Sequence, residues 1–113
     1  MAYSRDDALR IAREFLEGAV RRHRIKLAFL FGSHAWARPS EHSDIDLAVV
    51  FEPVTPTHDA EYDEQFEIFH EAQKFNSALE VVCFTPEEFE SDGGALIRRI
   101  KKEGLEVWRA APM

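Results

Sequence analysis

The sequence has a single cysteine and no apolar run close to the roughly 20 residues that a membrane span needs. With only Cys83, the chain cannot form an internal disulfide, which fits a reducing compartment such as the cytoplasm. Cys83 lies in the apolar run 81–84 and is expected to be a small core residue. The first residues carry acids and no apolar segment of the kind found in secretion signals. We therefore expect a cytoplasmic protein with no membrane contact.

An excess of basic residues is also missing. The 113 residues include 21 acids against 14 lysines and arginines, a net charge of −7. Because polyanions are bound through positive surface charge, nucleic acid is not expected as a partner. The charge is uneven, with six acids and no Lys or Arg in 59–71 and four basic residues in 98–102. Each run is either a solvated helix face or a face that docks a partner.

The length and an apolar content of 45% predict one domain, residues 1–113, with a single core. Ser4 is expected to cap a first helix, which would have Arg21, Arg22 and Arg24 in its last turn. Apolar runs predict strands at 25–31, 44–51 and 79–84, with the first at the centre of a sheet.

A second helix is predicted at about 58–76 from the spacing of Tyr62, Phe66, Phe69 and Ala72. Thr85 and Pro86 begin a short helix, Gly93 and Gly94 break it, and a last helix (95–102) and an edge strand (105–109) follow. The crossover from the second strand through a helix to the third makes these two strands parallel.

Asp44 and Asp46 open the second strand, directly before the apolar run 47–51. Strand side chains alternate between faces, so the two carboxylates share one face at a separation of roughly 7 Å. Paired oxygen ligands suit Mg²⁺ or Mn²⁺, and two carboxylates suit a site for two ions. Glu80 opens the next strand, and parallel pairing would bring it to the same edge of the sheet. Glu80 could also be a surface residue at that edge.

Gly32 and Ser33 follow the first strand, where backbone N–H groups and a hydroxyl could hold a phosphate. Without the downstream aspartates the pair would be an ordinary turn. His23, His42, His58 and His70 have no zinc-like spacing and are interpreted as surface or capping residues.

Gly32-Ser33, followed at fixed spacing by Ser43-Asp44-Ile45-Asp46-Leu47-Ala48-Val49, resembles the signature of the minimal nucleotidyltransferases in the DNA polymerase β superfamily. Glu80 stands where the family usually has its third acid, and the segment 97–108 resembles the closing helix and strand. The resemblance implies an α/β (α+β) fold, the small nucleotidyltransferase palm, with a mixed central sheet and helices mainly on one side.

By the same resemblance, Gly32 and Ser33 would contact the nucleotide phosphates, and Arg38 is the nearest cation to them. Asp44, Asp46 and Glu80 would be the catalytic residues and would hold two Mg²⁺ ions. The implied function is transfer of a nucleoside monophosphate, AMP from ATP, to a protein partner. Members of the family often act as antitoxins beside a HEPN-type helical toxin.

Two departures from the family pattern are Ala37, where glycine is usual, and Glu80 in place of aspartate. They support an alternative function, a binding module that neutralises its partner by complex formation without turnover. Transfer to a small molecule such as an aminoglycoside is a weaker alternative, because such enzymes usually carry an extra domain. The acceptor, the nucleobase and the oligomeric state, including a homo-oligomer, stay open.

Overall fold

The computed structural model describes residues 4–32, 44–52, 60–91 and 94–110, with side chains described in α3 only from Glu64 onward. The elements follow one another in the predicted order. They are α1 (Arg5–Ala19), β1 (Ile25–Phe31), β2 (Ile45–Phe51), α3 (Ala60–Phe75), β3 (Leu79–Phe84), α4 (Pro86–Glu90), α5 (Ala95–Glu103) and β4 (Leu105–Arg109).

The four strands form one mixed sheet in the order β3-β2-β1-β4. β1 pairs antiparallel with both β2 and β4, whereas β2 and β3 are parallel, as the crossover length predicts. β1 and β2 occupy the centre of the sheet and β3 and β4 its two edges, so the predicted central position of the first strand is confirmed.

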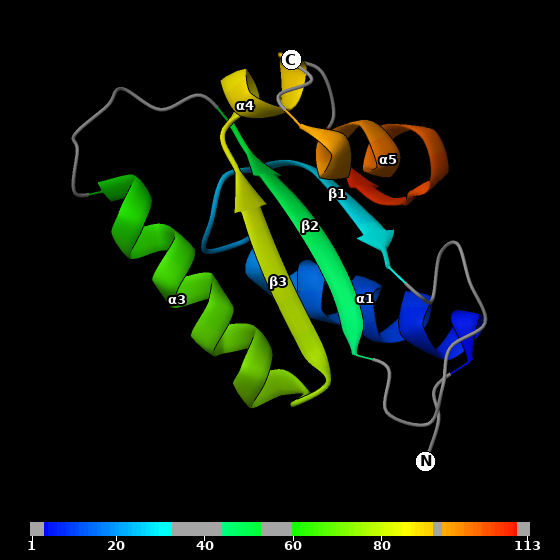
Figure 1. The fold of residues 1–113 in the computed structure, drawn as a ribbon. Helices are drawn as coiled ribbons and strands as arrows, with labels where there is room; N and C mark the ends of the chain where they lie inside the picture. The colour runs from blue at the N-terminus through cyan, green and yellow to red at the C-terminus, as the bar shows by residue number, and fades with distance from the viewer. Residues whose placement is uncertain (1–3, 33–43, 53–59, 92–93, 111–113) are drawn as a thin grey trace.

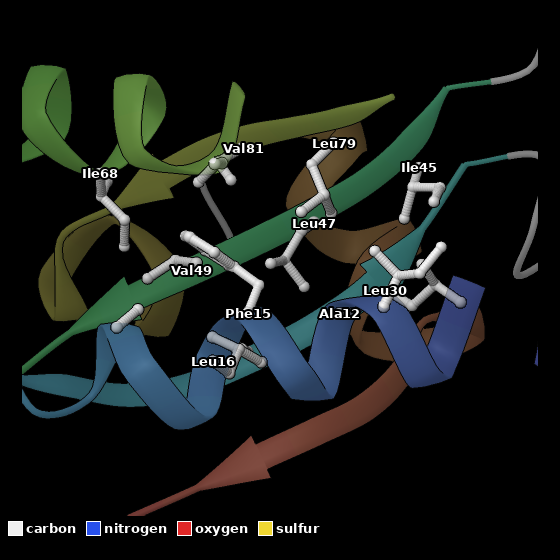
Figure 2. Close-up of a cluster of buried hydrophobic side chains, with 14 of the residues drawn as sticks. Ala12, Phe15, Leu16, Leu30, Ile45, Leu47, Val49, Ile68, Leu79 and Val81 are labelled. Carbon is white, nitrogen blue, oxygen red and sulfur yellow. The ribbon is translucent and has the colours of Figure 1, made fainter. Parts of the chain in front are cut away.

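The two longer helices cover one face of the sheet and the two shorter helices cover the other (Figure 1). Residues at alternate positions of β2 explain this division, because strand side chains point to opposite faces in turn. Ile45, Leu47 and Val49 pack with α1 and α3, as Figure 2 shows, whereas Ala48 and Val50 pack with α4 and α5. The mixed sheet is thus confirmed, with the long helices on one side and additional cover on the other.

Local signals place the helix starts where the sequence predicts them. Ser4 accepts a hydrogen bond from the Asp7 N–H at 3.0 Å, and the Asp7 side chain accepts one from the Ser4 N–H, which completes a capping box. Thr85 and Glu88 form the same arrangement at the start of α4, with Pro86 in the first turn.

The end of α1 differs from the prediction. The helix ends at Ala19 with no basic residue in its last turn, so Arg21, Arg22 and Arg24 come after it. In the segment after the helix, Arg22 and His23 both contact α3. His23 is buried and lies between two carboxylates, with Nδ1 3.3 Å from Glu64 Oε1 and Nε2 3.0 Å from Glu71 Oε2. The prediction of a surface or capping role is therefore wrong for this histidine.

Glu71 also accepts two hydrogen bonds from the Arg22 guanidinium, each at 3.3 Å. Burial by itself would raise the pKa of the Glu71 carboxyl, but the hydrogen bonds from Arg22 and His23 outweigh it and lower that pKa. His23, Glu64, Glu71 and Arg22 thus tie the segment after α1 to α3.

Replacing His23 with alanine is expected to lower the free energy of unfolding by about 2 kcal/mol, because the partly buried carboxylates of Glu64 and Glu71 both lose their contact with the imidazole, although Glu71 keeps Arg22. The Glu71 carboxylate should stabilise the fold less as the pH falls below 4.5, the ordinary pKa of glutamate, because its pKa in the folded protein is lower than that. Urea unfolding at pH 7 and pH 4 measures both effects. His70→Ala is the control, because His70 is exposed. If His23→Ala and His70→Ala lower the free energy of unfolding equally, the stabilising role of His23 is contradicted.

The apolar stripe predicted for the second helix is only partly correct. Ile68 and Ala72 of α3 are fully buried against the sheet, whereas Phe66 and Phe69 remain 60% and 39% exposed. Because α3 packs beside the edge strand β3, the helix turns only one narrow side to the core, and the two phenylalanines lie outside it. None of the helices in the described ranges is long and apolar enough to cross a membrane.

Candidate active site

The start of β2 carries the two aspartates, and the turn before β3 holds it in place. The Ile45 N–H donates to the Ala78 carbonyl at 2.7 Å, and the Leu79 N–H donates to the Asn76 carbonyl at 2.9 Å. The Asn76 side chain caps the same turn by accepting from the Ala78 N–H at 2.9 Å. These backbone bonds set the parallel register and therefore the relative positions of the acids.

In that register Asp46 of β2 lies directly opposite Glu80 of β3. Both belong to the strand face that further along carries Ala48, Val50 and Phe84. They lie near the beginning of their strands, whereas α4 follows the far end of β3 (Figure 1). The two carboxylates are therefore side by side at the end of the sheet away from α4.

Three negative charges act on one another here. The pKa of the Asp46 carboxyl is raised to about 6, first by burial and then by the charges of Glu80 and Asp44. Such crowding of anions disfavours the folded chain by itself and is relieved by a cation. Hard carboxylate oxygens of this kind are the ligands that Mg²⁺ prefers.

Gly32, which the sequence predicts to contact phosphate, lies against the same aspartate. Gly32 follows Phe31, which pairs with Asp46 across the antiparallel β1–β2 ladder. Its φ is +74°, and a Cβ atom at this position would lie 2.1 Å from Asp46 Oδ2. Only glycine allows this backbone conformation and this approach together, so the close contact explains the residue type.

A polar depression of about 280 Å³ lies beside the acids, lined by Asp44, Phe69, Gln73, Ser77 and Glu80. Gln73 Nε2 donates to the Leu79 carbonyl and so fixes α3 to the beginning of β3. Sequence reasoning did not assign Phe69, Gln73 or Ser77 to the site. The four-residue spacing of Phe69 and Gln73, which places both on one side of a helix, is the signal that could have found them.

The structure thus brings together Asp44, Asp46, Glu80 and Gly32. Ser33 and Arg38, predicted to contact phosphate, lie outside the described residues, as does Ala37. No group of three or more His, Cys, Asp or Glu side chains among the described residues is arranged to hold a metal ion. The acids therefore share one end of the sheet without converging on one point. The residue types fit a divalent cation, and convergence on it requires side-chain rotation.

Comparisons with known proteins agree with this geometry. Residues 14–110 match the family model described as polymerase beta, nucleotidyltransferase. A search of curated proteins found no match. Among solved structures, a candidate nucleotidyltransferase from Sulfolobus solfataricus is 19% identical with a TM-score of 0.63, and the match covers 93% of this chain and 83% of that one.

Two further structures of similar fold are toxin–antitoxin complexes. A toxin–antitoxin structure with AMP-PNP is 16% identical with a TM-score of 0.56, covering 87% of this chain and 73% of that one. The MntA-HepT toxin–antitoxin structure is 16% identical with a TM-score of 0.50, covering 91% of this chain and 71% of that one. At these identities the likeness concerns the fold, and the family assignment rests on the family model. This chain belongs to the polymerase β nucleotidyltransferase family.

Proposed function

We propose that this protein transfers AMP from ATP to a hydroxyl group of a partner protein, in a reaction that depends on Mg²⁺. The observation that carries the proposal is the register that sets Asp46 opposite Glu80, with Gly32 turned against Asp46. A nucleotide-facing glycine and two acids on adjacent strands are the parts that such a transfer requires.

In the proposed reaction the acceptor oxygen bonds to the α-phosphorus of ATP while the bond to the β-phosphate oxygen breaks. Pyrophosphate leaves with the electrons of that bond, and the proton of the acceptor hydroxyl would pass to the carboxylate of Glu80. Bound Mg²⁺ ions would supply positive charge to the oxygens on which negative charge develops. Asp44, Asp46 and Glu80 would hold these ions, and Glu80 would lie nearest the acceptor because β3 is the outer strand. Gly32 lets the Asp46 carboxylate lie against the backbone, in the position from which it would hold an ion.

The partner is proposed to be the toxin of a toxin–antitoxin pair, a HEPN-type helical protein. Two observations support this: the similar folds occur in toxin–antitoxin complexes, and this acidic chain offers little attraction to nucleic acid. The acceptor site would be completed by the partner.

The test is transfer of label from α-³²P-ATP to the protein encoded next to this chain, with Mg²⁺ present. We expect the partner to become labelled and the labelling to disappear when EDTA removes the metal. Glu17→Gln is a matched control, because Glu17 is an exposed acid of α1 away from the site, and it should transfer at the wild-type rate. Absence of label on the partner with wild-type protein would remove the proposal.

A second function, neutralisation of the partner by binding alone, is favoured by the acids that do not converge on one point. The two functions predict different behaviour of the double variant Asp44→Ala/Asp46→Ala. If this variant still protects cells from the partner as well as wild type does, binding is sufficient.

A further inference from the structure

An apolar groove runs between α3 and the edge strand β3. We call it the α3–β3 groove; it has a volume of about 360 Å³ and is lined by Gln65, Phe66, Phe69, Val81, Val82 and Cys83. Three consecutive strand residues line it, although successive strand side chains point to opposite faces. The groove therefore includes the outer edge of β3 itself. Within the described residues β3 pairs only with β2, so this edge is open to another segment.

The groove adjoins the polar depression of the candidate active site. Phe69 lines both, together with Asp44 and Glu80 in the depression and with Val82 and Cys83 in the groove. A segment lying along β3 in the groove would thus have one end beside the acids.

The order of the strands indicates the side from which a segment in the groove would approach the acids. Gly32 follows β1, Asp46 is on β2 and Glu80 is on β3, so the three occupy successive positions across the sheet. The groove lies beyond Glu80, on the side away from Gly32. A triphosphate beside Gly32 and an occupant of the groove would therefore approach the acids from opposite sides, as donor and acceptor of a group must for in-line attack.

The charges around the groove indicate the chemistry of the occupant. The charge of Glu64 on α3 acts on Cys83 of the groove, and Glu80 lines the adjoining depression, in a chain whose net charge is −7. Burial and the Glu64 charge raise the pKa of the Cys83 thiol to about 12, so Cys83 is a neutral, apolar part of the lining. An apolar lining with an acid near Cys83 and another in the adjoining depression complements a segment that has apolar side chains between lysines or arginines.

We propose that the α3–β3 groove docks an extended segment of the partner protein, apolar at its centre and flanked by basic residues, and so delivers the acceptor hydroxyl to Glu80. This inference rests on the proposed function for the fate of the hydroxyl, and on the groove alone for the docking. Phe66 is the expected anchor, since aromatic side chains contribute most to interfaces and this residue is 60% exposed.

The test uses three synthetic peptides and ¹⁵N-labelled protein. The first peptide places Leu-Tyr-Leu between two pairs of lysines, the second has glutamates in place of the lysines, and the third keeps the lysines around three serines. We expect the first to bind at least tenfold more tightly than the other two, with amide shifts confined to α3 and β3. Phe66→Ala should weaken its binding about fivefold or more. Leu96→Ala is the matched control, because Leu96 is 45% exposed on α5, and should leave binding unchanged.

Equal binding of the three peptides, shifts away from α3 and β3, or no effect of Phe66→Ala would overturn the inference. Self-association in sedimentation that Phe66→Ala abolishes would also overturn it, because a second copy of this chain would then occupy the groove. Peptide binding is measured without ATP, so it does not depend on transfer. If the Phe66→Ala variant transfers AMP to the partner at the normal rate, docking in the α3–β3 groove is contradicted and the proposed function still stands. If the first peptide binds but no transfer to the partner occurs, the proposed function is contradicted and docking in the groove still stands.

Discussion

Replacing Asp46 with asparagine is expected to lower kcat/KM for AMP transfer by about a thousandfold or more, because a neutral amide cannot replace a carboxylate that holds a cation. Asparagine keeps the shape of the side chain and should leave its contact with Gly32 in place. The loss should therefore appear in catalysis and metal binding and not in folding. Transfer measured with α-³²P-ATP at saturating Mg²⁺ gives the first quantity, and Mn²⁺ titration by calorimetry gives the second.

The same variant should be more stable than wild type at neutral pH without metal. The pKa of Asp46 is about 6 in the folded protein against an ordinary value of 3.8, so the folded state binds a proton more tightly than the unfolded state does. Wild type then loses stability as the pH rises from about 4 through 6, where asparagine does not change charge. Since Asp46 is only half-buried, solvent screening reduces the difference at pH 8 to about 1 kcal/mol.

Urea unfolding of both proteins at pH 4 and pH 8 measures this difference. The gain should be small at pH 4 and full at pH 8, and saturating Mg²⁺ should reverse it by stabilising wild type alone. Glu17→Gln, an exposed carboxylate on α1, should show neither change. An Asp46→Asn variant less stable than wild type at pH 8 would mean that Asp46 is satisfied by the fold and not held ready for a cation.

Replacing Gly32 with alanine is expected to lower transfer by about a hundredfold or more, because the new Cβ would force the Asp46 carboxylate to move. That Cβ would lie 2.1 Å from Asp46 Oδ2 and 3.0 Å from its Cγ. The positive φ adds strain of about 1–2 kcal/mol for any residue with a Cβ. The variant should therefore lose stability and activity together.

The variant Gly94→Ala separates the effect of backbone strain from the effect of displacing the Asp46 carboxylate. Gly94 also has a positive φ, +137°, but a Cβ there would meet nothing within 4 Å. This variant should lose stability from backbone strain and keep its transfer rate. Thermal unfolding together with transfer kinetics distinguishes the cases, and a Gly94→Ala variant as inactive as Gly32→Ala would show that strain alone explains the loss.

The elements that the sequence predicted well are those specified by local patterns. Capping boxes at Ser4 and Thr85 begin α1 and α4, and continuous apolar runs give β1, β2 and β3. The parallel pairing of β2 and β3 also followed from chain length, because a helix must cross over between them. These features depend on neighbours within a few residues, or on handedness, and so can be inferred from one chain.

The predictions that were wrong depended on what each residue meets in space. His23 was expected at the surface, and it is buried between Glu64 and Glu71, more than 40 positions along the chain. Phe66 and Phe69 fit an apolar stripe, yet the edge position of β3 leaves them outside the core. Periodicity gives the apolar side of a helix but not how much of that side the sheet can cover.

By itself the sequence determined which residue types were available for the chemistry: a glycine after one strand, two aspartates opening the next and a glutamate opening the third. Only the tertiary structure decided that Gly32 touches Asp46, that Asp46 lies opposite Glu80, and that a groove extends beyond Glu80. The physical reason is that strand register and strand order are set by hydrogen bonds and burial between distant segments. A pattern along one chain does not contain those contacts.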